Sequence, residues 1–232
     1  MEYLSLHSNK LTGHIPYSIG RLSFLSTLTI YNNNISGSIP ESINGLISLN
    51  TLDLSKNNLE GPIPNGIGNC TYVKIFSAHS NNITGTLPAS LANCTRLWLL
   101  DLRKNGLTGD LPQYITSFQD LEALILGYNN LHGYIPQHIT NLTKLHVLDL
   151  SNNKFSGRIP TQLERLIGFA NVSNNEELDW ESIIDIKGIE YNVSYLLPAN
   201  TIFDLSCNNL IGEIPTNIGS MSSLRLLNLS GN

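Results

Sequence analysis

Residues 52–64, with the sequence LDLSKNNLEGPIP, decide the fold because the same pattern returns along almost the whole chain. Written as L-x-L-x-x-N-x-L-x-G-x-I-P, the pattern repeats every 24 residues. Its asparagine falls at Asn9, Asn33, Asn57, Asn81, Asn105, Asn129 and Asn153, and then at Asn208 and Asn232. A fixed period of this length marks a solenoid, in which each repeat forms one coil that stacks on the next.

The first part of the pattern predicts a strand. Leu52 and Leu54 alternate with the polar residues Thr51, Asp53 and Ser55, which is the period-two pattern of a half-buried strand. We expect the leucines to point into the core and the polar residues to line the outer face of a parallel sheet. One coil cannot bury its apolar side alone, whereas stacked coils can.

The second part of the pattern predicts a turn and a return segment. Asn57 has both donors and acceptors in its amide, so it can satisfy backbone groups where the chain turns inside the solenoid. Gly61 suits a backbone position that disfavours a Cβ, with positive φ. Pro64 lacks an N–H and suits a turn where no ladder bond is needed. Residues 65–73 are expected to return as a short helix.

Gly-x-Ile-Pro after Asn-x-Leu resembles the plant-specific class of leucine-rich repeats, in register over residues 1–169 and 201–232. That class occurs in plant receptor-like kinases, receptor-like proteins and polygalacturonase inhibitors. The resemblance implies an α/β repeat solenoid: a leucine-rich-repeat superhelix with a parallel concave β-sheet and short helical or 3-10 convex segments. It also implies an extracellular binding module rather than an enzyme.

The regular repeat breaks once. We expect regular repeats over residues 1–169, an irregular acidic segment over 170–200, called the island below, and resumed, truncated repeats over 201–232. The island's six acids and one base give a charge of −5, equal to that of the whole chain. Residues 187–191, KGIEY, resemble the segment after the island of plant receptor-like proteins and some peptide-hormone receptor kinases. There the island helps to bind ligand or to receive a co-receptor.

The island therefore supplies candidate ligand-binding residues, with a solvated loop as the alternative. The candidates are Glu177, Asp179, Trp180 and Tyr191. An acidic segment favours a cationic partner, and the two aromatic side chains would anchor it.

The outward columns of the concave sheet supply a second set of candidates. They are Tyr31, His79, Arg103, Lys104 and Tyr128, residue types that anchor interfaces or pair with carboxylates. A merely solvated face is the alternative. Ile75 and Ile125 fall at positions expected to face solvent, which predicts a partly apolar concave face.

An enzyme is the weakest interpretation. Asp53 and Asp101 share a column two coils apart, roughly 10 Å, which is near the separation of the carboxylates in inverting glycosidases. Asp-Leu-Ser is the usual strand of this repeat class, however, and nothing in the sequence raises the pKa of one carboxylate above that of another. His7 and His79 lie three coils apart, too far to share a metal. We expect no cofactor and no metal.

Composition excludes other classes of function. Charged residues make up 13% of the chain, against about 25% in typical globular proteins, and no Lys/Arg cluster suggests nucleic-acid binding. Eight N-x-Ser/Thr sequons are present where about five would arise by chance, which favours a secreted glycoprotein. They start at Asn34, Asn69, Asn82, Asn93, Asn141, Asn171, Asn192 and Asn228.

The cysteines and the chain ends lead to two further expectations. Cys70 and Cys94 lie one period apart and are expected to be small buried core residues. A bridge between neighbouring coils is the alternative, if their Cβ vectors allow it. With no signal peptide, apolar run or cap residues, we expect a fragment of a larger ectodomain whose parent is anchored in the plasma membrane.

The sequence thus predicts a ligand- or protein-binding module of a plant receptor-like protein or receptor kinase, located outside the cell. Its partners would be a peptide, protein or glycan and a co-receptor ectodomain. A soluble inhibitor of microbial cell-wall hydrolases such as polygalacturonase is the first alternative. A glycosidase is the second.

Overall fold

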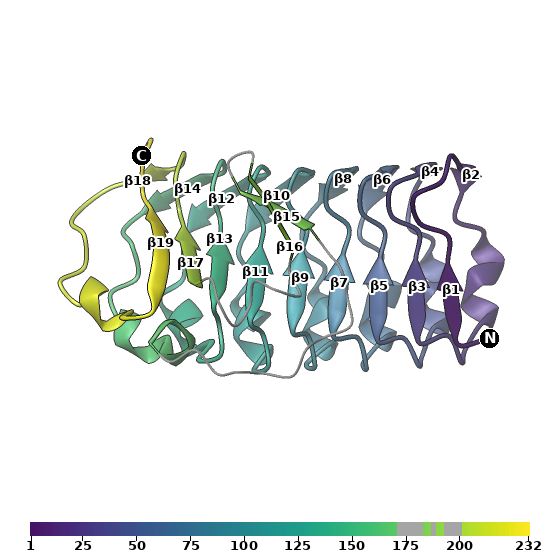
Figure 1. Ribbon diagram of the computed structural model, residues 1–232, viewed down its shortest axis with the longest axis horizontal. Helices are drawn as coiled ribbons and strands as arrows, with labels where there is room; N and C mark the ends of the chain where they lie inside the picture. The colour runs from purple at the N-terminus through teal and green to yellow at the C-terminus, as the bar shows by residue number, and fades with distance from the viewer. Residues whose placement is uncertain (171–182, 187–188, 193–200) are drawn as a thin grey trace.

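A parallel sheet runs along one face of the array and takes one strand from each coil (Figure 1). The computed structural model describes residues 1–170, 183–186, 189–192 and 201–232. Within these residues the concave sheet has nine strands: β1 (Tyr3–Ser5), β3 (Thr27–Thr29), β5 (Thr51–Asp53), β7 (Ile75–Ser77), β9 (Leu99–Asp101), β11 (Ala123–Ile125), β13 (Val147–Asp149), β17 (Thr201–Asp204) and β19 (Leu224–Asn228). Leu28 pairs with Leu52, and Leu52 with Phe76, so each inward side chain lies over the next. The predicted leucine-rich-repeat solenoid is confirmed.

A second parallel sheet, which the repeat pattern did not predict, follows the turn of each coil. In the described part of the chain it has eight strands: β2 (Thr12–His14), β4 (Asn34–Gly37), β6 (Asn58–Pro62), β8 (Asn82–Gly85), β10 (Gly106–Asp110), β12 (Asn130–Tyr134), β14 (Lys154–Gly157) and β18 (Asn209–Leu210). Leu59 is buried between exposed Asn58 and Glu60, so these strands also alternate. They were missed because so short a run gives little period-two signal.

The return segments are 3-10 helices. They are η1 (Tyr17–Arg21), η2 (Glu41–Gly45), η3 (Asn65–Asn69), η4 (Ala89–Asn93), η5 (Gln113–Ser117), η6 (Gln137–Asn141), η7 (Leu163–Arg165), η8 (Ile167–Phe169) and η9 (Ile218–Ser220). Pro64 precedes η3 with φ −70° and ψ 149°, and its carbonyl accepts a hydrogen bond from the Ile67 amide at 3.2 Å. Separately, β15 (Ile183–Ile186) and β16 (Ile189–Asn192) pair as an antiparallel hairpin.

The asparagine column ties each coil to its neighbour. Asn57 Nδ2 donates to the carbonyls of Ile30, Leu54 and Ser55 at 3.0–3.2 Å, and Asn57 Oδ1 accepts from the Ile35 amide at 3.0 Å. Equivalent bonds recur at Asn33, Asn81, Asn105, Asn129, Asn153 and Asn208. Because the carbonyls and amides come from two successive coils, one side chain fixes both the turn and the stacking. The predicted structural role of this column is confirmed.

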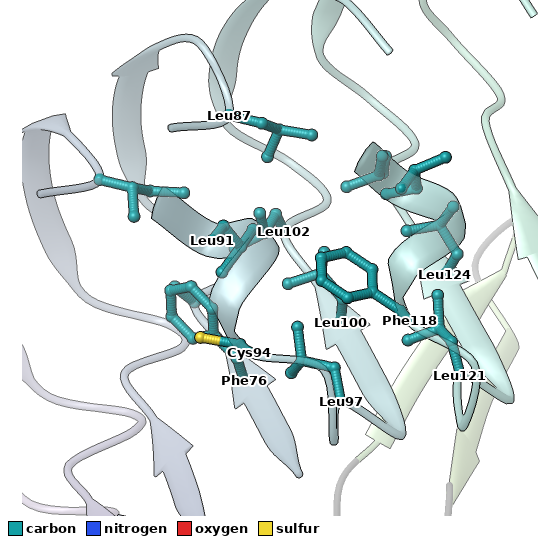
Figure 2. Packing of buried hydrophobic residues seen from close by; sticks show 14 of the residues in the cluster. Phe76, Leu87, Leu91, Cys94, Leu97, Leu100, Leu102, Phe118, Leu121 and Leu124 are labelled. Atoms are coloured by element: carbon teal, nitrogen blue, oxygen red, sulfur yellow. The ribbon is translucent and has the colours of Figure 1, made fainter. Parts of the chain in front are cut away.

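Leucine and phenylalanine side chains fill the space between the concave sheet and the 3-10 helices (Figure 2). Phe76, Leu100, Leu102 and Phe118 are fully buried there. Cys94 lies beside the Phe76 ring in Figure 2. Cys70 and Cys94 are free and buried, as core residues, and each thiol donates to a backbone carbonyl one coil earlier, at 3.4 Å.

Two physical reasons explain why the pattern requires glycine at this position. Gly61 has φ +75° and Gly157 φ +78°, the left-handed region that side chains rarely adopt. A Cβ at Gly157 would also lie 2.5 Å from the Tyr134 ring of the preceding coil. The predicted positive φ at Gly61 is therefore confirmed, and the close approach of the neighbouring coil adds to it.

We predict that Leu102→Ala lowers the free energy of unfolding by about 2–5 kcal/mol, because it opens a cavity in a fully buried layer. Urea or guanidinium melts measure it. Thr108→Ala, at an exposed position of β10, is the control and should change stability by less than about 0.5 kcal/mol. A loss below that value at Leu102 would contradict the core position.

We further predict that Asn57→Ala costs at least about 2 kcal/mol, since it leaves buried backbone groups of two coils without partners. The adjacent Asn58→Ala is the matched control, because Asn58 is exposed. Equal melting curves for the two variants would show that the asparagine column is dispensable.

Candidate ligand-binding surface on the concave sheet

The first outward column of the concave sheet turns apolar part-way along the array. Its members, in strand register, are Tyr3, Thr27, Thr51, Ile75, Leu99, Ala123, Val147, Ile202 and Leu226. Ile75, Leu99, Ala123, Ile125, Val147 and Ile202, which we call the apolar strip, form a hydrophobic cluster separate from the main core. Trp98 and Leu226 pack against it.

The apolar strip corrects one expectation. Ile75 and Ile125 were expected to face solvent, but they are 4% and 0% exposed. Both side chains belong to this buried hydrophobic cluster. In the sequence, the residue before the first inward strand side chain marks five members of the strip, and Ile125 lies in the next outward column.

Aspartates occupy the next outward column. Asp53 Oδ1 accepts from the Ser55 amide at 3.0 Å and from its hydroxyl at 2.6 Å, and Asp204 makes the same pair of bonds with Ser206. Burial raises the pKa of Asp53 to about 6, against the Ser55 hydrogen bonds that lower it. Burial likewise raises the pKa of Asp149 to about 6, and the nearby Asp204 charge adds to the shift.

Burial raises the pKa of Asp101 as well, so Asp53, Asp101 and Asp149 all shift in the same direction. Burial is the cause, and it is a property of the tertiary structure. Burial also argues against a polysaccharide substrate, because Asp53, Asp101 and Asp149 are 1–3% exposed. Among the described residues no three His, Cys, Asp or Glu side chains are placed to hold a metal ion.

The candidate residues His79, Arg103, Lys104 and Tyr128 differ in how deeply they are buried. His79 and Arg103 are each 2% exposed. Arg103 Nη1 lies 3.6 Å from Asp101 Oδ2. Lys104 and Tyr128 lie instead on the rim, the column just before the asparagines, with φ of +54° and +58°. Lys104 Nζ is 5.8 Å from the centre of the Tyr128 ring, which remains exposed.

The first two coils and the rim of the third keep some outward side chains accessible, whereas Thr29 and Thr51 are buried. Tyr31 is half-buried, and its ring stacks on exposed His7 with 4.5 Å between the ring centroids and 4° between the planes. Tyr3 is 71% exposed, and Lys56 on the rim is exposed. The structure thus separates Tyr31 from the buried His79 and Arg103, which occupy the same position of the repeat.

Four candidate residues belong to the island. Glu177, Asp179 and Trp180 lie outside the described residues, and for Tyr191 only the backbone of β16 is described. They remain predictions.

The sequons differ in their accessibility. Asn34 and Asn82 are exposed on the second sheet, and Asn69 and Asn93 are exposed at the ends of η3 and η4. Asn141 is half-buried, and Asn228 Nδ2 donates to Asp204 and Ser206. Asn171 lies outside the described residues, and Asn192 is described only as backbone in β16.

Family models described as leucine-rich repeat match residues 1–22, 24–46, 48–70, 100–155 and 201–221, more than half of the chain. The chain belongs to the leucine-rich-repeat family.

Solved structures similar to this leucine-rich-repeat chain include plant receptor ectodomains. The plant peptide hormone receptor RGFR1 in complex with RGF2 is 33% identical with a TM-score of 0.82, over 99% of this chain and 32% of the receptor chain. The Arabidopsis receptor kinase HAESA ectodomain, bound to an extended IDA peptide hormone, is 33% identical with a TM-score of 0.78, over 98% and 33%. PEPR1–AtPEP1 is 27% identical with a TM-score of 0.70, over 99% and 35%.

These matches identify a leucine-rich-repeat module of the plant receptor-ectodomain type. The chain spans about a third of the length of these ectodomains. Comparison with curated protein sequences gave no match. Across residues 1–170, 183–186, 189–192 and 201–232, every helix is too short or too polar to cross a bilayer.

We predict that the leucine-rich-repeat module loses stability as pH rises from about 4 to above 6. The pKa of Asp53 is about 6 in the folded protein, against an ordinary 3.8. Its contribution to the free energy of unfolding is therefore fully present below pH 3.8 and is lost as the pH rises through 6. The shift corresponds to as much as about 3 kcal/mol at neutral pH. Urea melts of the wild type and Asp53→Asn between pH 4 and 7.5 measure it.

The wild-type stability relative to Asp53→Asn should fall across this pH window. Glu60→Gln, which removes an exposed carboxylate from β6, should leave the pH dependence unchanged. A constant difference between wild type and Asp53→Asn at every pH would contradict the raised pKa.

Proposed function

We propose that this module recognises an extracellular peptide or protein on the first two coils of its concave sheet and on the adjacent rim at Lys56. It would do so as part of a plant receptor-like protein or receptor kinase, at the cell surface, in signalling or defence. A co-receptor ectodomain would be its second partner.

One observation carries this proposal: within the described residues, the middle of the concave sheet is buried, whereas its first two coils expose part of their outward surface. From Asp53 to Ser206, the central outward columns are buried. Tyr3, the His7–Tyr31 stack and Lys56 remain accessible to a partner. Tyrosine supplies a large, rigid contact at low entropic cost, and lysine supplies a charge for a carboxylate.

The peptide complexes of the similar receptor ectodomains support a peptide as the ligand. RGFR1, HAESA and PEPR1 are solved with RGF2, IDA and AtPEP1 respectively, and HAESA also with the co-receptor SERK1. An extended peptide advances about 3.3 Å per residue, so three coils at about 4.8 Å each hold roughly four residues. The remaining ligand contacts would then fall on the island, or on regions that the longer receptor ectodomains have and this chain does not span.

We predict that Tyr31→Ala weakens binding at least tenfold for whichever peptide of a panel containing RGF2, IDA and AtPEP1 binds the wild type. Truncating a stacked aromatic anchor typically costs at least about 1.4 kcal/mol, which is tenfold in Kd. Isothermal titration calorimetry measures the affinities. Tyr134→Ala is the matched control, because Tyr134 is 74% exposed at the end of a second-sheet strand, β12.

Equal losses in Tyr31→Ala and Tyr134→Ala, or no binding by any peptide, would contradict this site. The same protein is tested against a microbial polygalacturonase. Inhibition of that enzyme, lost in Tyr31→Ala, would favour the inhibitor alternative over the receptor.

A further inference from the structure

An open hollow of about 540 Å³ lies at the rim, where the concave sheet turns into the second sheet. Asn82, Thr84, Lys104, Gly106 and Tyr128 line it. These residues come from three successive coils, and the apolar strip and the buried aspartates contribute nothing to its lining.

Gly106 creates the hollow. In the neighbouring coils the same repeat position holds an asparagine, Asn82 before it and Asn130 after it. Gly106 has no side chain to occupy the space, and a Cβ there would already approach Thr84 Cγ2 to 3.2 Å. The gap therefore lies beside Asn82, whereas the coil that follows Asn34, the other exposed sequon of this sheet, carries Asn58 at this position.

Asn82 and Thr84 are presented as an acceptor for an N-linked glycan. Both are exposed on the outer face of β8, with buried Ile83 between them. Neither side chain makes a hydrogen bond within the described part of the chain, in contrast to Asn228, which is held by Asp204. The amide and hydroxyl of an Asn-x-Thr sequon are thus both open to solvent.

Tyr128 offers a platform for a sugar on the opposite side of the hollow. Its ring is 41% exposed and is held at the rim by a left-handed backbone, with the Lys104 ammonium 5.8 Å from the ring centre. Tyrosine presents an apolar ring and a polar hydroxyl, which match the apolar face and the hydroxyls of a pyranose. Two coils, roughly 10 Å, separate Tyr128 from Asn82. The first two sugars of an N-linked chain span that distance.

We propose that the hollow seats the first sugars of an N-linked glycan on Asn82, stacked on the Tyr128 ring. This inference rests on the extracellular location in the proposed function. In the modification, Asn82 Nδ2 attacks the first sugar of a lipid-pyrophosphate-linked oligosaccharide. The N–C1 bond forms, the lipid pyrophosphate leaves, and the nitrogen loses one proton. A glycan seated there covers Tyr128 and confines the ligand to the first coils.

The test uses the whole chain secreted from insect cells fed with ¹³C-labelled N-acetylglucosamine. Mass spectrometry of glycopeptides should show Asn82 occupied. In an NMR spectrum, the acetyl methyl of a sugar on Asn82 should show an upfield ring-current shift. Tyr128→Ala should abolish the shift and Tyr128→Phe should keep it, because phenylalanine retains the ring. The Asn34 glycan is the internal control, since Lys56 and Ser80 replace Lys104 and Tyr128 there.

A thermal double-mutant cycle gives the second measurement. Asn82→Gln should lower the Tm of the glycoprotein by about 2 °C or more, and should have no effect in the Tyr128→Ala background. An unoccupied Asn82, an unshifted methyl resonance, or equal Tm losses in both backgrounds would each overturn the proposal. None of these readouts involves the peptide ligand, so failure here leaves the proposed function standing, and failure of peptide binding leaves the glycan site standing.

Discussion

The buried asparagine side chains are the constraint on which the rest of this solenoid depends. Each one satisfies backbone groups of its own coil and of the coil before it, where water cannot reach. An unpaired buried backbone group costs about as much as a lost hydrogen bond, so these bonds fix the chain's path at every turn. The residue before each asparagine is forced into the left-handed region, as at Lys104 and Tyr128. The rim that they form is thus a consequence of the same bonds.

Stacking in register places like positions one strand spacing apart, and this has opposite consequences for apolar and charged columns. An apolar column is stabilised, because neighbours such as Leu99 and Ala123 shield each other from water. A carboxylate column is destabilised, because like charges such as Asp149 and Asp204 lie in adjacent coils and each is buried. The structure relieves this cost with serine hydroxyls and amides two residues on, and with Arg103 beside Asp101. The aspartate column is therefore best understood as a tolerated feature of the strand and not as catalytic machinery.

The surface has three parts that differ in their accessibility to a partner. The middle of the concave sheet is buried, the first two coils expose part of their outward surface, and the rim carries a hollow where one glycine replaces an asparagine. A repeat protein obtains function from such departures, since a perfectly regular array presents the same chemistry at every coil. Tyr31 beside His7, and Gly106 between Asn82 and Tyr128, are departures of this kind.

The sequence by itself determined the repeat, the inward leucines, the structural asparagines and the positive φ of the glycines. These follow from local spacing, because a 24-residue period repeats the same environment in each coil. It also located Tyr31, Lys104 and Tyr128 on outward columns. Only the tertiary structure decided that Asp53 titrates near 6, that His79 and Arg103 are buried, and that Asn82 and Tyr128 share one hollow. Burial, desolvation and packing across coils depend on what neighbouring and distant segments place around a side chain, and the period of a sequence carries no information about that.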